Sequence, residues 1–396
     1  MTRSRRDFLV QLASVTAATA TFSAIAHGMP TEVLRPDIDA SWQNSTTANH
    51  SSPSERKIGY CIVGLGRISM GEFMPGLRIA KQSKLVALVS GHRPKAERMA
   101  DLYGLSHKAI YNYENYDTIR NNPEIDAVYI ALPNGMHAEY TIRAAKAGKH
   151  VLCEKPMANS IQECEQMIAA CKQANRKLLI AYRCRYEPNT LKAIQVLRSG
   201  YAGKIQNIQA AFGFNIKPGE WRLNKKMAGG GPLVDVGVYC IQATRYLTGE
   251  EPTEVQGFSS VVDHDGRFTE VEENLVWNTR FPSGVVADCA TSYGSSYTGN
   301  IARVTGDKGM LKLDPAYSYS GIRGGATAKD AQPMGIDIND PNPNQFAREA
   351  DVLAECILQN KEPLTNGEEG LRDERIITAI YQSCAEGRPV YLGGRT

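Results

Sequence analysis

Short apolar runs alternate with longer amphipathic stretches over the first half of the chain, beginning near residue 57. The apolar runs have the length and composition of buried strands, and they cover residues 57–63, 84–90, 126–132, 149–153 and 178–182. Between them, stretches such as 137–148 and 161–175 have the spacing of helices. This alternation of strand and helix predicts a doubly wound parallel sheet, as in a Rossmann domain, over residues 56–182.

The pattern changes after residue 204, where strand-like runs follow one another with turn signals such as Pro282-Ser283-Gly284 between them. These runs cover residues 205–214, 254–262, 271–281, 285–291, 300–306 and 310–313. A single helical stretch interrupts them at residues 233–239. Consecutive strands predict an antiparallel or mixed sheet with one covered face. We therefore expect an α/β chain whose second domain, residues 183–396, is of the α+β type with a largely antiparallel, open-faced sheet.

The N-terminus has the features of a twin-arginine-type export signal. Arg5 and Arg6 precede a mildly apolar stretch that ends in Ala24-Ile25-Ala26, a small-x-small cleavage pattern. We expect residues 1–26 to be the signal peptide and residues 27–55, rich in Ser, Thr, Asn and Pro, to be an extended arm or linker. The alternative is an ordinary N-terminal helix. The signal predicts a periplasmic protein that is exported already folded, with no stable membrane span.

The amino-acid composition limits the kinds of partner that we expect this protein to bind. The 396 residues include 45 basic and 42 acidic ones, and no basic block is present, so nucleic acid is not an expected partner. The nine cysteines are odd in number and form no Cys-x-x-Cys pair, which favours neither a zinc site nor a disulfide framework. We expect no metal. The open sheet could pair with a second copy, so we expect a homo-oligomer, either a dimer or a tetramer.

A glycine-rich turn follows the first predicted strand. In Gly64-Leu65-Gly66-Arg67-Ile68-Ser69, two glycines permit a tight turn and the close approach of a pyrophosphate to the start of a helix. Ser69 stands where the usual fingerprint has a third glycine. The second strand ends in Ser90-Gly91-His92-Arg93-Pro94-Lys95, which has two cations and no carboxylate. This composition suits the 2′-phosphate of NADP better than the ribose of NAD, although a solvated basic turn in an NAD protein is the alternative.

Polar residues collect at the predicted carboxyl ends of later strands, where ligands bind in open α/β sheets. Glu154 and Lys155 end one strand, because Pro156 cannot continue it. Asp235 and Tyr239 are four residues apart in the helical stretch, so they share one face. That face can reach a sugar hydroxyl or carbonyl. A surface lysine, a capping aspartate and a packed tyrosine are the alternatives.

The motifs GLGRIS, ALPNGMH, CEKPM, LLIAYRCRYEPN, EWR, AGGGPLVDVGVY, TRYLTGEEPTEV and NQF resemble the glucose–fructose oxidoreductase branch of the superfamily that also holds inositol dehydrogenase. The resemblance runs from about residue 57 to about residue 390. It implies that Lys155 and Tyr239 are the catalytic pair and that Asp235 orients the sugar. It implies cofactor contacts from Gly64, Leu65, Gly66, Arg67, Ile68, Ser69, Ser90, Lys95, Tyr113, Ala131, Leu132, Pro133, Asn134, Gly135, Met136, Glu154, Lys155, Arg183, Trp221, Arg222 and Tyr319. It also implies that C-terminal helices at about 344–359 and 367–384 pack against the nucleotide domain.

The expected chemistry is hydride transfer between a sugar and tightly bound NADP. Tyr239 would act as the base if the Lys155 ammonium lowered its pKa well below the usual value of ~10. An exported enzyme meets little free cofactor, which favours oxidation of a glucose-like aldose to the aldonolactone, coupled to reduction of a fructose-like ketose to the polyol. The alternatives are a monofunctional NADP-dependent sugar dehydrogenase or reductase, an NAD-dependent glycosidase, and a redox-silent sugar-binding protein.

Overall fold

The computed structural model describes residues 56–336 and 344–393. The predicted signal peptide, residues 1–26, and the predicted arm, residues 27–55, lie outside the described residues and stay predictions.

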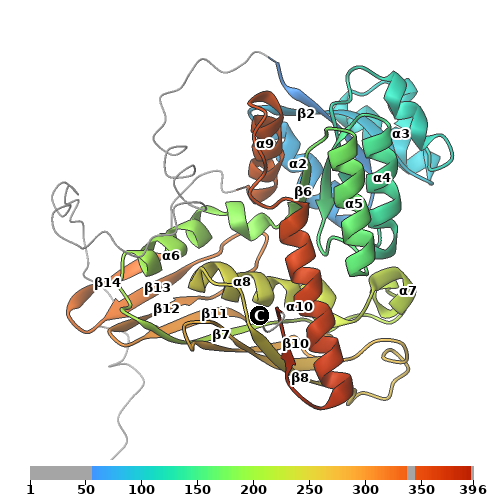
Figure 1. Cartoon of the computed structure of the whole chain (residues 1–396). Coiled ribbons are helices and arrows are strands. Elements are labelled where there is room, and N and C mark those ends of the chain that lie inside the picture. Colours follow the sequence, from blue (N-terminus) through green and yellow to red (C-terminus); the bar gives the residue numbers. More distant parts are fainter. Residues whose placement is uncertain (1–55, 337–343, 394–396) are drawn as a thin grey trace, which may run out of the picture. The chain divides into compact units, whose positions relative to one another are not determined.

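A six-stranded parallel sheet forms the centre of the first domain (Figure 1). Its strands are β1 (Ile58–Val63), β2 (Ser83–Val89), β3 (Ile110–Tyr111), β4 (Ala127–Ile130), β5 (His150–Glu154) and β6 (Leu178–Ala181). They lie in the order β3-β2-β1-β4-β5-β6, and every pair is parallel. The predicted doubly wound parallel sheet is confirmed. Strand β3, two residues long, is too short for a periodic signal and was not expected.

The helices of the first domain follow from this strand order. They are η1 (Ser69–Phe73), α2 (Met74–Ile79), α3 (Arg93–Tyr103), α4 (His137–Lys146) and α5 (Ile161–Gln173), with short 3₁₀ turns at η2 (His107–Ala109), η3 (Tyr116–Asn121) and η4 (Asn134–Met136). The strand order reverses at β1, so right-handed crossovers place α2 and α3 on one face of the sheet and α4 and α5 on the other. The carboxyl ends of β1 and β4 meet at this reversal point, where α/β sheets bind ligands.

The second domain is a nine-stranded sheet. Its strands are β7 (Ile205–Gly213), β8 (Glu254–Ser260), β9 (Asn274–Arg280), β10 (Val286–Ser292), β11 (Asn300–Gly306), β12 (Gly309–Leu313), β13 (Gly324–Ala328), β14 (Ala331–Ile336) and β15 (Val390–Tyr391). Their order is β14-β13-β12-β11-β7-β10-β9-β8-β15, and within the described sheet β7 and β10 form the one parallel pair. The expected mixed, largely antiparallel sheet is confirmed. The sequence pattern missed three strands: β13 is glycine-rich, β15 is two residues long, and β14 is mostly exposed and contains a proline and a glycine.

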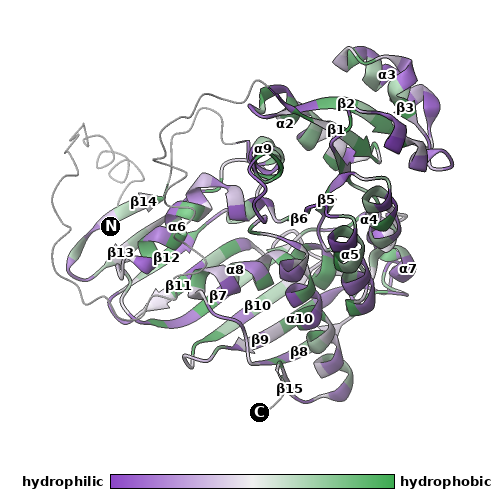
Figure 2. Ribbon diagram, turned by 45° about the horizontal axis from the view of Figure 1, so that its top comes forward, coloured by the Kyte–Doolittle hydropathy of each residue, from purple (hydrophilic) through white to green (hydrophobic). Residues whose placement is uncertain are grey.

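Helices cover one face of this sheet. The helical segments of the second domain are η5 (Arg183–Tyr186), α6 (Pro188–Arg198), η6 (Trp221–Leu223), α7 (Lys225–Ala228), η7 (Leu233–Gly237), α8 (Val238–Thr248), α9 (Gln345–Leu358) and α10 (Gly367–Glu386). Helix α8 packs on β7, β10 and β11, and nearly all its residues are buried. Along β9, buried and exposed residues alternate, as expected for a strand with one solvated face. Figure 2 shows that hydrophilic and hydrophobic residues both occur along the strands of this sheet.

The other face of the sheet is open. Phe258 and Val276 are 61% and 48% exposed there. They line an open hollow of about 400 Å³ together with polar side chains such as Gln209 and Asp288. This face therefore carries a mixture of apolar and polar groups on a flat β surface.

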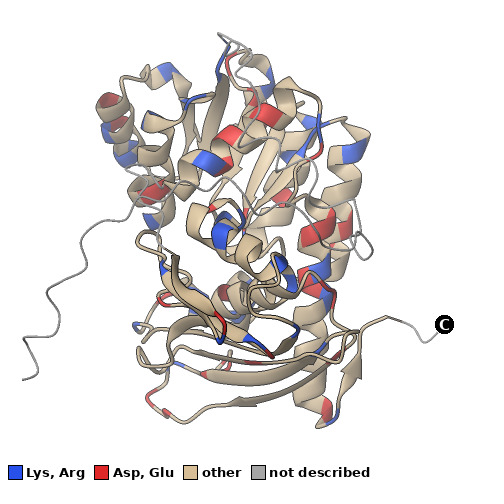
Figure 3. Cartoon of the chain, turned by 90° about the vertical axis from the view of Figure 1, so that its left-hand side faces the viewer, with Lys and Arg blue, Asp and Glu red and all other residues tan. Residues whose placement is uncertain are grey.

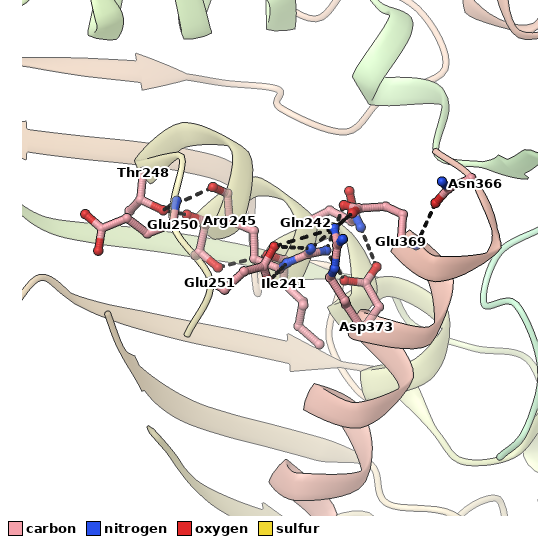
Figure 4. A network of polar contacts seen from close by, with 11 residues as sticks. Ile241, Gln242, Arg245, Thr248, Glu250, Glu251, Asn366, Glu369 and Asp373 are labelled. Atoms are coloured by element: carbon pink, nitrogen blue, oxygen red, sulfur yellow. Dashed lines mark hydrogen bonds and ion pairs between the residues drawn. The ribbon is translucent and has the colours of Figure 1, made fainter. Parts of the chain in front are cut away.

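Two C-terminal helices pack against the parallel-sheet domain. Helix α9 packs on α2, β2 and β5, and α10 packs on α5 and β6 as well as on α8 and β8. Buried charges join α10 to α8 (Figure 4). Arg245 donates to Asp373 at 2.6 Å and to Glu251 at 2.8 Å, and Gln242 also donates to Asp373. These contacts fix the helix that carries Tyr239.

The distribution of charged and apolar residues over the described part of the chain shows no unusual feature. Figure 3 shows basic and acidic residues interspersed over the described part of the chain. Among the described residues no helix is long and apolar enough to cross a membrane. The same residues contain no cluster of three or more His, Cys, Asp or Glu side chains that could hold a metal ion. All nine cysteines are free thiols, and all but Cys384 are buried.

Candidate active site

The glycine turn after β1 forms a tight loop with room above it. Gly64 has φ +96°, and a Cβ there would lie 2.6 Å from the carbonyl oxygen of Ala131, so only glycine fits. A Cβ on Gly66 would meet no atom within 4 Å, which leaves space for a pyrophosphate to approach the backbone. The Ser69 hydroxyl donates to the Gly64 carbonyl at 2.5 Å, so this side chain closes the loop. The loop therefore fits a dinucleotide, with Ser69 acting on the loop itself.

The segment after β2 carries a hydroxyl, Ser90, and an ammonium, Lys95, and the ammonium contacts the glycine loop. Lys95 Nζ donates to the carbonyl of Leu65 at 2.8 Å, and Ser90 Oγ accepts from the backbone N–H of His92 at 3.1 Å. Arg93 instead donates to Glu97 at 2.8 Å, away from the loop. The ring of Tyr113 packs over Gly91, where an added Cβ would lie 3.1 Å from it. Of the two predicted cations, Lys95 is therefore the one that contacts the glycine loop.

The segment after β4 is only partly available to a cofactor. Ala131, Pro133 and Met136 are half-buried at the sheet edge. The buried Asn134 side chain, by contrast, donates to the carbonyl of Ala228 at 2.7 Å, and a Cβ on Gly135 would lie 2.6 Å from the carbonyl of Lys226. Helix α7 thus occupies the side of the segment on which Asn134 and Gly135 lie. These contacts place Asn134 in the junction between the domains.

Lys155 is tied to Asp235 and faces the ring of Tyr239. Its Nζ donates to the Asp235 backbone carbonyl at 2.7 Å and to Asp235 Oδ1 at 3.2 Å. The same nitrogen lies 4.8 Å from the centre of the Tyr239 ring. The Lys155 side chain is 11% exposed, so it is not a surface lysine. The neighbouring Glu154 accepts from the hydroxyl of Tyr129 at 2.6 Å and from the backbone N–H of Lys155 at 3.2 Å.

Asp235 is held by three donors. Besides Lys155, Arg222 Nε donates to Asp235 Oδ2 at 2.9 Å, and the Tyr293 hydroxyl donates to the same oxygen at 2.9 Å. Burial alone would raise the pKa of Asp235, but the cations of Arg222 and Lys155 and the Tyr293 hydrogen bond outweigh it and hold the pKa well below its usual range. Asp235 is therefore an ionised carboxylate. Arg222 also stacks on Trp221, with its guanidinium 4.6 Å from the ring centre.

The pKa of Tyr239 departs from the expectation. Burial raises it above its usual value, and Arg183, whose Nε donates to the Tyr239 hydroxyl at 3.0 Å, offsets only part of the increase. The prediction that Lys155 lowers this pKa well below ~10 is thus wrong for the protein alone. The reason is geometric: the ammonium contacts Asp235 and the face of the ring, while the cation at the hydroxyl is Arg183.

Arg183 connects the phenol to the C-terminal part of the chain. Its Nη1 donates to Gln345 Oε1 at 2.8 Å and to the carbonyl of Ser318 at 3.0 Å. Its guanidinium lies 4.7 Å from the centre of the Tyr319 ring as well as 4.7 Å from that of Tyr239. The side chain is 3% exposed, so Arg183 is a buried organising cation.

A local distortion of the helix brings Asp235 and Tyr239 to Lys155. Asp235 lies in the π-helical segment η7, whereas Tyr239 lies in the first turn of α8. Single π turns inside helices are frequent at functional sites. The sequence predicted one regular helix face, and the structure places both residues against Lys155 through this irregular turn.

Behind Tyr239 lies a small hollow. It is bounded by Lys155, Tyr182, Arg185 and Tyr246, and only about 10 Å³ of it is open to the centre of a water molecule. That is room for about one water and not for a sugar.

The predicted site residues fall into two groups. Lys155, Asp235, Tyr239, Arg183 and Arg222 form one continuous set of contacts, and Glu154, Trp221 and Tyr319 adjoin it. The glycine loop, Ser90, Lys95 and Tyr113 form the second group around β1 and β2. Arg67 joins the two domains through an ion pair with Glu220.

Sequence reasoning missed three residues that hold the site: Tyr129, Tyr293 and Gln345. Each acts through one hydrogen bond to Glu154, Asp235 or Arg183. Gln345 lies in the NQF motif and Tyr293 directly follows β10, which are the only signals the sequence offered.

A glycine cradle on a Rossmann sheet beside a buried lysine, tyrosine and aspartate defines an oxidoreductase that uses a nicotinamide dinucleotide. Comparison with protein families agrees. Residues 58–182 match the oxidoreductase family with an NAD-binding Rossmann fold, and residues 190–312 match the GFO/IDH/MocA C-terminal domain. The chain belongs to the GFO/IDH/MocA oxidoreductase family, which confirms the superfamily expected from its motifs.

Comparison with known relatives describes this class of oxidoreductase more closely. The crystal structure of an aldose-aldose oxidoreductase from Caulobacter crescentus, complexed with glycerol, is 44% identical, covers 85% of this chain and all of that chain, and superposes with a TM-score of 0.82. The D-xylose 1-dehydrogenase [NADP(+)] of Haloarcula marismortui is 28% identical over 86% of this chain and 93% of its own length. A levoglucosan dehydrogenase in complex with NADH and levoglucosan, 21% identical with a TM-score of 0.74, covers 85% of this chain and all of its own and shares the fold. The chain is therefore an oxidoreductase with an NAD(P)-binding Rossmann domain, and the two relatives of higher identity are named for activities on aldoses and on D-xylose.

Proposed function

We propose that this protein oxidises an aldose to its aldonolactone and returns the hydride to a second sugar on one tightly bound NADP. The observation that carries the proposal is the contact set of Lys155, Asp235, Tyr239 and Arg183 at the carboxyl ends of β5 and β6. It combines an ionised carboxylate, a phenol and two cations in a buried place next to a dinucleotide loop.

The roles follow from the contacts. Oxidation of a sugar at C1 removes a hydride from carbon and a proton from the hydroxyl. Tyr239 is the group that takes this proton, because Arg183 donates to its oxygen and stabilises the phenolate, which offsets part of the rise in pKa that burial causes. When bound, NADP would supply the hydride acceptor and the positive charge of its oxidised nicotinamide. Asp235 orients the sugar by accepting from its hydroxyls, and Lys155 holds Asp235 in place.

The preference for NADP rests on the end of β2. Lys95 and Ser90 lie beside the glycine loop, and residues 90–95 contain no carboxylate that would repel a 2′-phosphate. The NADP-dependent xylose dehydrogenase relative supports the same choice.

The identity of the second sugar, which accepts the hydride, is a separate question. The sequence led to a ketose such as fructose, whereas the name of the Caulobacter crescentus relative favours an aldose as the acceptor. Both acceptors present a carbonyl that a protonated Tyr239 can serve as an acid. Testing a ketose and a second aldose as hydride acceptors in the same experiment decides between these two possibilities.

The experiment is an absorbance scan of protein purified and dialysed without added nucleotide. Addition of glucose is expected to produce the near-ultraviolet band of NADPH, and the true acceptor, either fructose or a second aldose, is expected to bleach it. A Tyr239→Phe variant serves as the matched control, because it should retain the nucleotide but not develop the band. Protein that carries no nucleotide after dialysis would refute the bound-cofactor proposal and favour the monofunctional dehydrogenase.

We also propose export through the twin-arginine route, which would carry the folded, cofactor-loaded protein across the membrane. Conversion of Arg5 and Arg6 to lysine is expected to leave full-length protein in the cytoplasmic fraction. Equal periplasmic amounts of both forms would contradict the assignment.

A further inference from the structure

Glu349 is a buried carboxyl group that has no role in the reaction proposed above. It lies on α9 and is fully buried, and neither of its carboxyl oxygens has a hydrogen-bond partner among the described residues. Gln345, one helical turn earlier on the same face, accepts from Arg183 at 2.8 Å. Glu349 therefore lies one turn behind the contact that holds the guanidinium at Tyr239.

The surroundings of Glu349 come from several elements. Helix α9 packs on β5 and η5, the elements that carry Glu154 and Arg183. The titratable groups electrostatically coupled to Glu349 are Tyr60 on β1, Tyr129 on β4, Glu154 on β5, and Arg183, Cys184 and Tyr186 on η5. Tyr129 donates to Glu154, which is the second carboxyl group of this set. Arg183 is the one cation in it.

An ionised carboxylate in such a place is costly, because burial without a partner removes its hydration. Burial raises the pKa of Glu349 well above its usual range, the charge of Glu154 raises it further, and Arg183 offsets only part of the rise. Burial also raises the pKa of Glu154. Lys155 and Arg183 both lower the pKa of Glu154, whereas Arg183 is the one cation that lowers the pKa of Glu349. Two buried carboxyl groups that act on each other do not both ionise readily, so the pair can hold a proton, and Glu349 is the member with less compensation for its charge.

We propose that Glu349, together with Glu154, holds a proton in the reduced state of the enzyme and releases it in the oxidised state. This inference rests on the proposed function. In the oxidative half-reaction the sugar loses one hydride and one proton, and the nicotinamide loses its positive charge. If the carboxyl pair takes up a proton as that charge disappears, the net charge of the buried site stays constant. In the reductive half-reaction the second sugar gains the hydride and one proton, and the pair gives its proton back.

Constant charge is the physical reason for the coupling. Charges interact strongly in a buried site, so loss of the positive charge leaves Glu154 and Glu349 more unfavourable as anions. Proton uptake cancels this penalty. Glu349 acts through Glu154 and Arg183 and is a proton-holding residue, since Asp235 and Tyr239 are the groups placed to meet the sugar.

The test compares the holoprotein loaded with NADP⁺ and with NADPH by infrared difference spectroscopy. The NADPH state is expected to show a stronger carbonyl band of a protonated carboxylic acid, and Glu349→Gln is expected to lose this increase. Glu355→Gln is the matched control, because Glu355 lies on the same helix and bonds Gln359 at the surface. It should keep the band.

A wild-type difference spectrum without that band, or a band that persists in Glu349→Gln, would overturn the inference. Neither outcome requires sugar turnover, so failure of the proposed function is seen separately as the absence of a sugar-induced NADPH band. A second measurement counts protons with an indicator dye while a saturating aldose reduces the bound cofactor. Wild-type protein should release fewer protons per hydride than Glu349→Gln, and equal ratios would contradict proton holding by Glu349.

Discussion

The three donors around Asp235 make Asp235→Asn the most informative substitution. The change keeps the shape of the side chain and the hydrogen bond from Tyr293, but it removes the negative charge that faces Lys155 and Arg222. Two buried or half-buried cations then lose their counter-ion. Removing one partner of a buried ion pair costs about 3–5 kcal/mol. Because Arg222 remains 32% exposed and Lys155 only 11%, most of the loss should come from Lys155, and we expect a value near the lower end, about 3 kcal/mol.

Urea unfolding near neutral pH measures this difference in the free energy of unfolding. Asp288→Asn is the control, because Asp288 lies exposed on the open face of the sheet. It should change stability by no more than about 0.5 kcal/mol. The pH dependence gives a second check. The pKa of Asp235 is lowered in the folded protein, so its contribution is fully present above the unfolded value of ~3.9 and is lost as the pH falls toward the folded value. A loss below about 1 kcal/mol for Asp235→Asn, where exposed pairs fall, would refute the view that Asp235 is a buried counter-ion.

Three further predictions concern Tyr239, Lys95 and Glu374, a buried residue of α10. Tyr239→Phe should reduce turnover about 10²–10⁴-fold while the bound nucleotide stays in place. The wild-type rate of sugar oxidation should rise with pH, because the raised pKa of Tyr239 keeps the phenol protonated near neutrality. A flat pH profile of this rate in stopped-flow measurements would contradict a proton-accepting role. Lys95→Glu should weaken NADP binding about 10- to 100-fold relative to NAD, the effect of losing one charge-assisted hydrogen bond, as measured by competition binding, and an unchanged ratio would remove Lys95 from the 2′-phosphate site. Glu374→Gln should stabilise the protein at about pH 8 but not below ~4.3, because burial raises the pKa of Glu374 to about 8 in the folded state. The contribution of Glu374 to the free energy of unfolding is fully present below the unfolded pKa and is lost as the pH rises through the folded pKa. Thermal melts at both pH values check this, and equal shifts at both would refute it.

The sequence could predict much of the fold because its signals are local. Strand and helix alternate up to β6, and Gly64, Gly66 and Pro156 mark a turn and a strand end by their backbone properties alone. The strands of the second sheet from β7 to β12 show the same local patterns. Strands β13 and β15 were missed because glycine-rich or two-residue segments carry almost no periodic signal. Strand β14 was missed because it is mostly exposed and contains Pro333 and Gly335.

What only the tertiary structure decided is which charges meet. The partners of Arg183 include Gln345, 162 residues away, and Lys155 meets Asp235 across 80 residues. Local spacing cannot encode such pairs, since packing of the two domains sets them. The same packing determines that burial outweighs nearby cations at Tyr239 and that Glu349 has no partner among the described residues. The sequence by itself thus determined the residue types and the strand ends that carry them, whereas solvation and long-range contact, which exist only in the folded chain, determined their protonation and their roles.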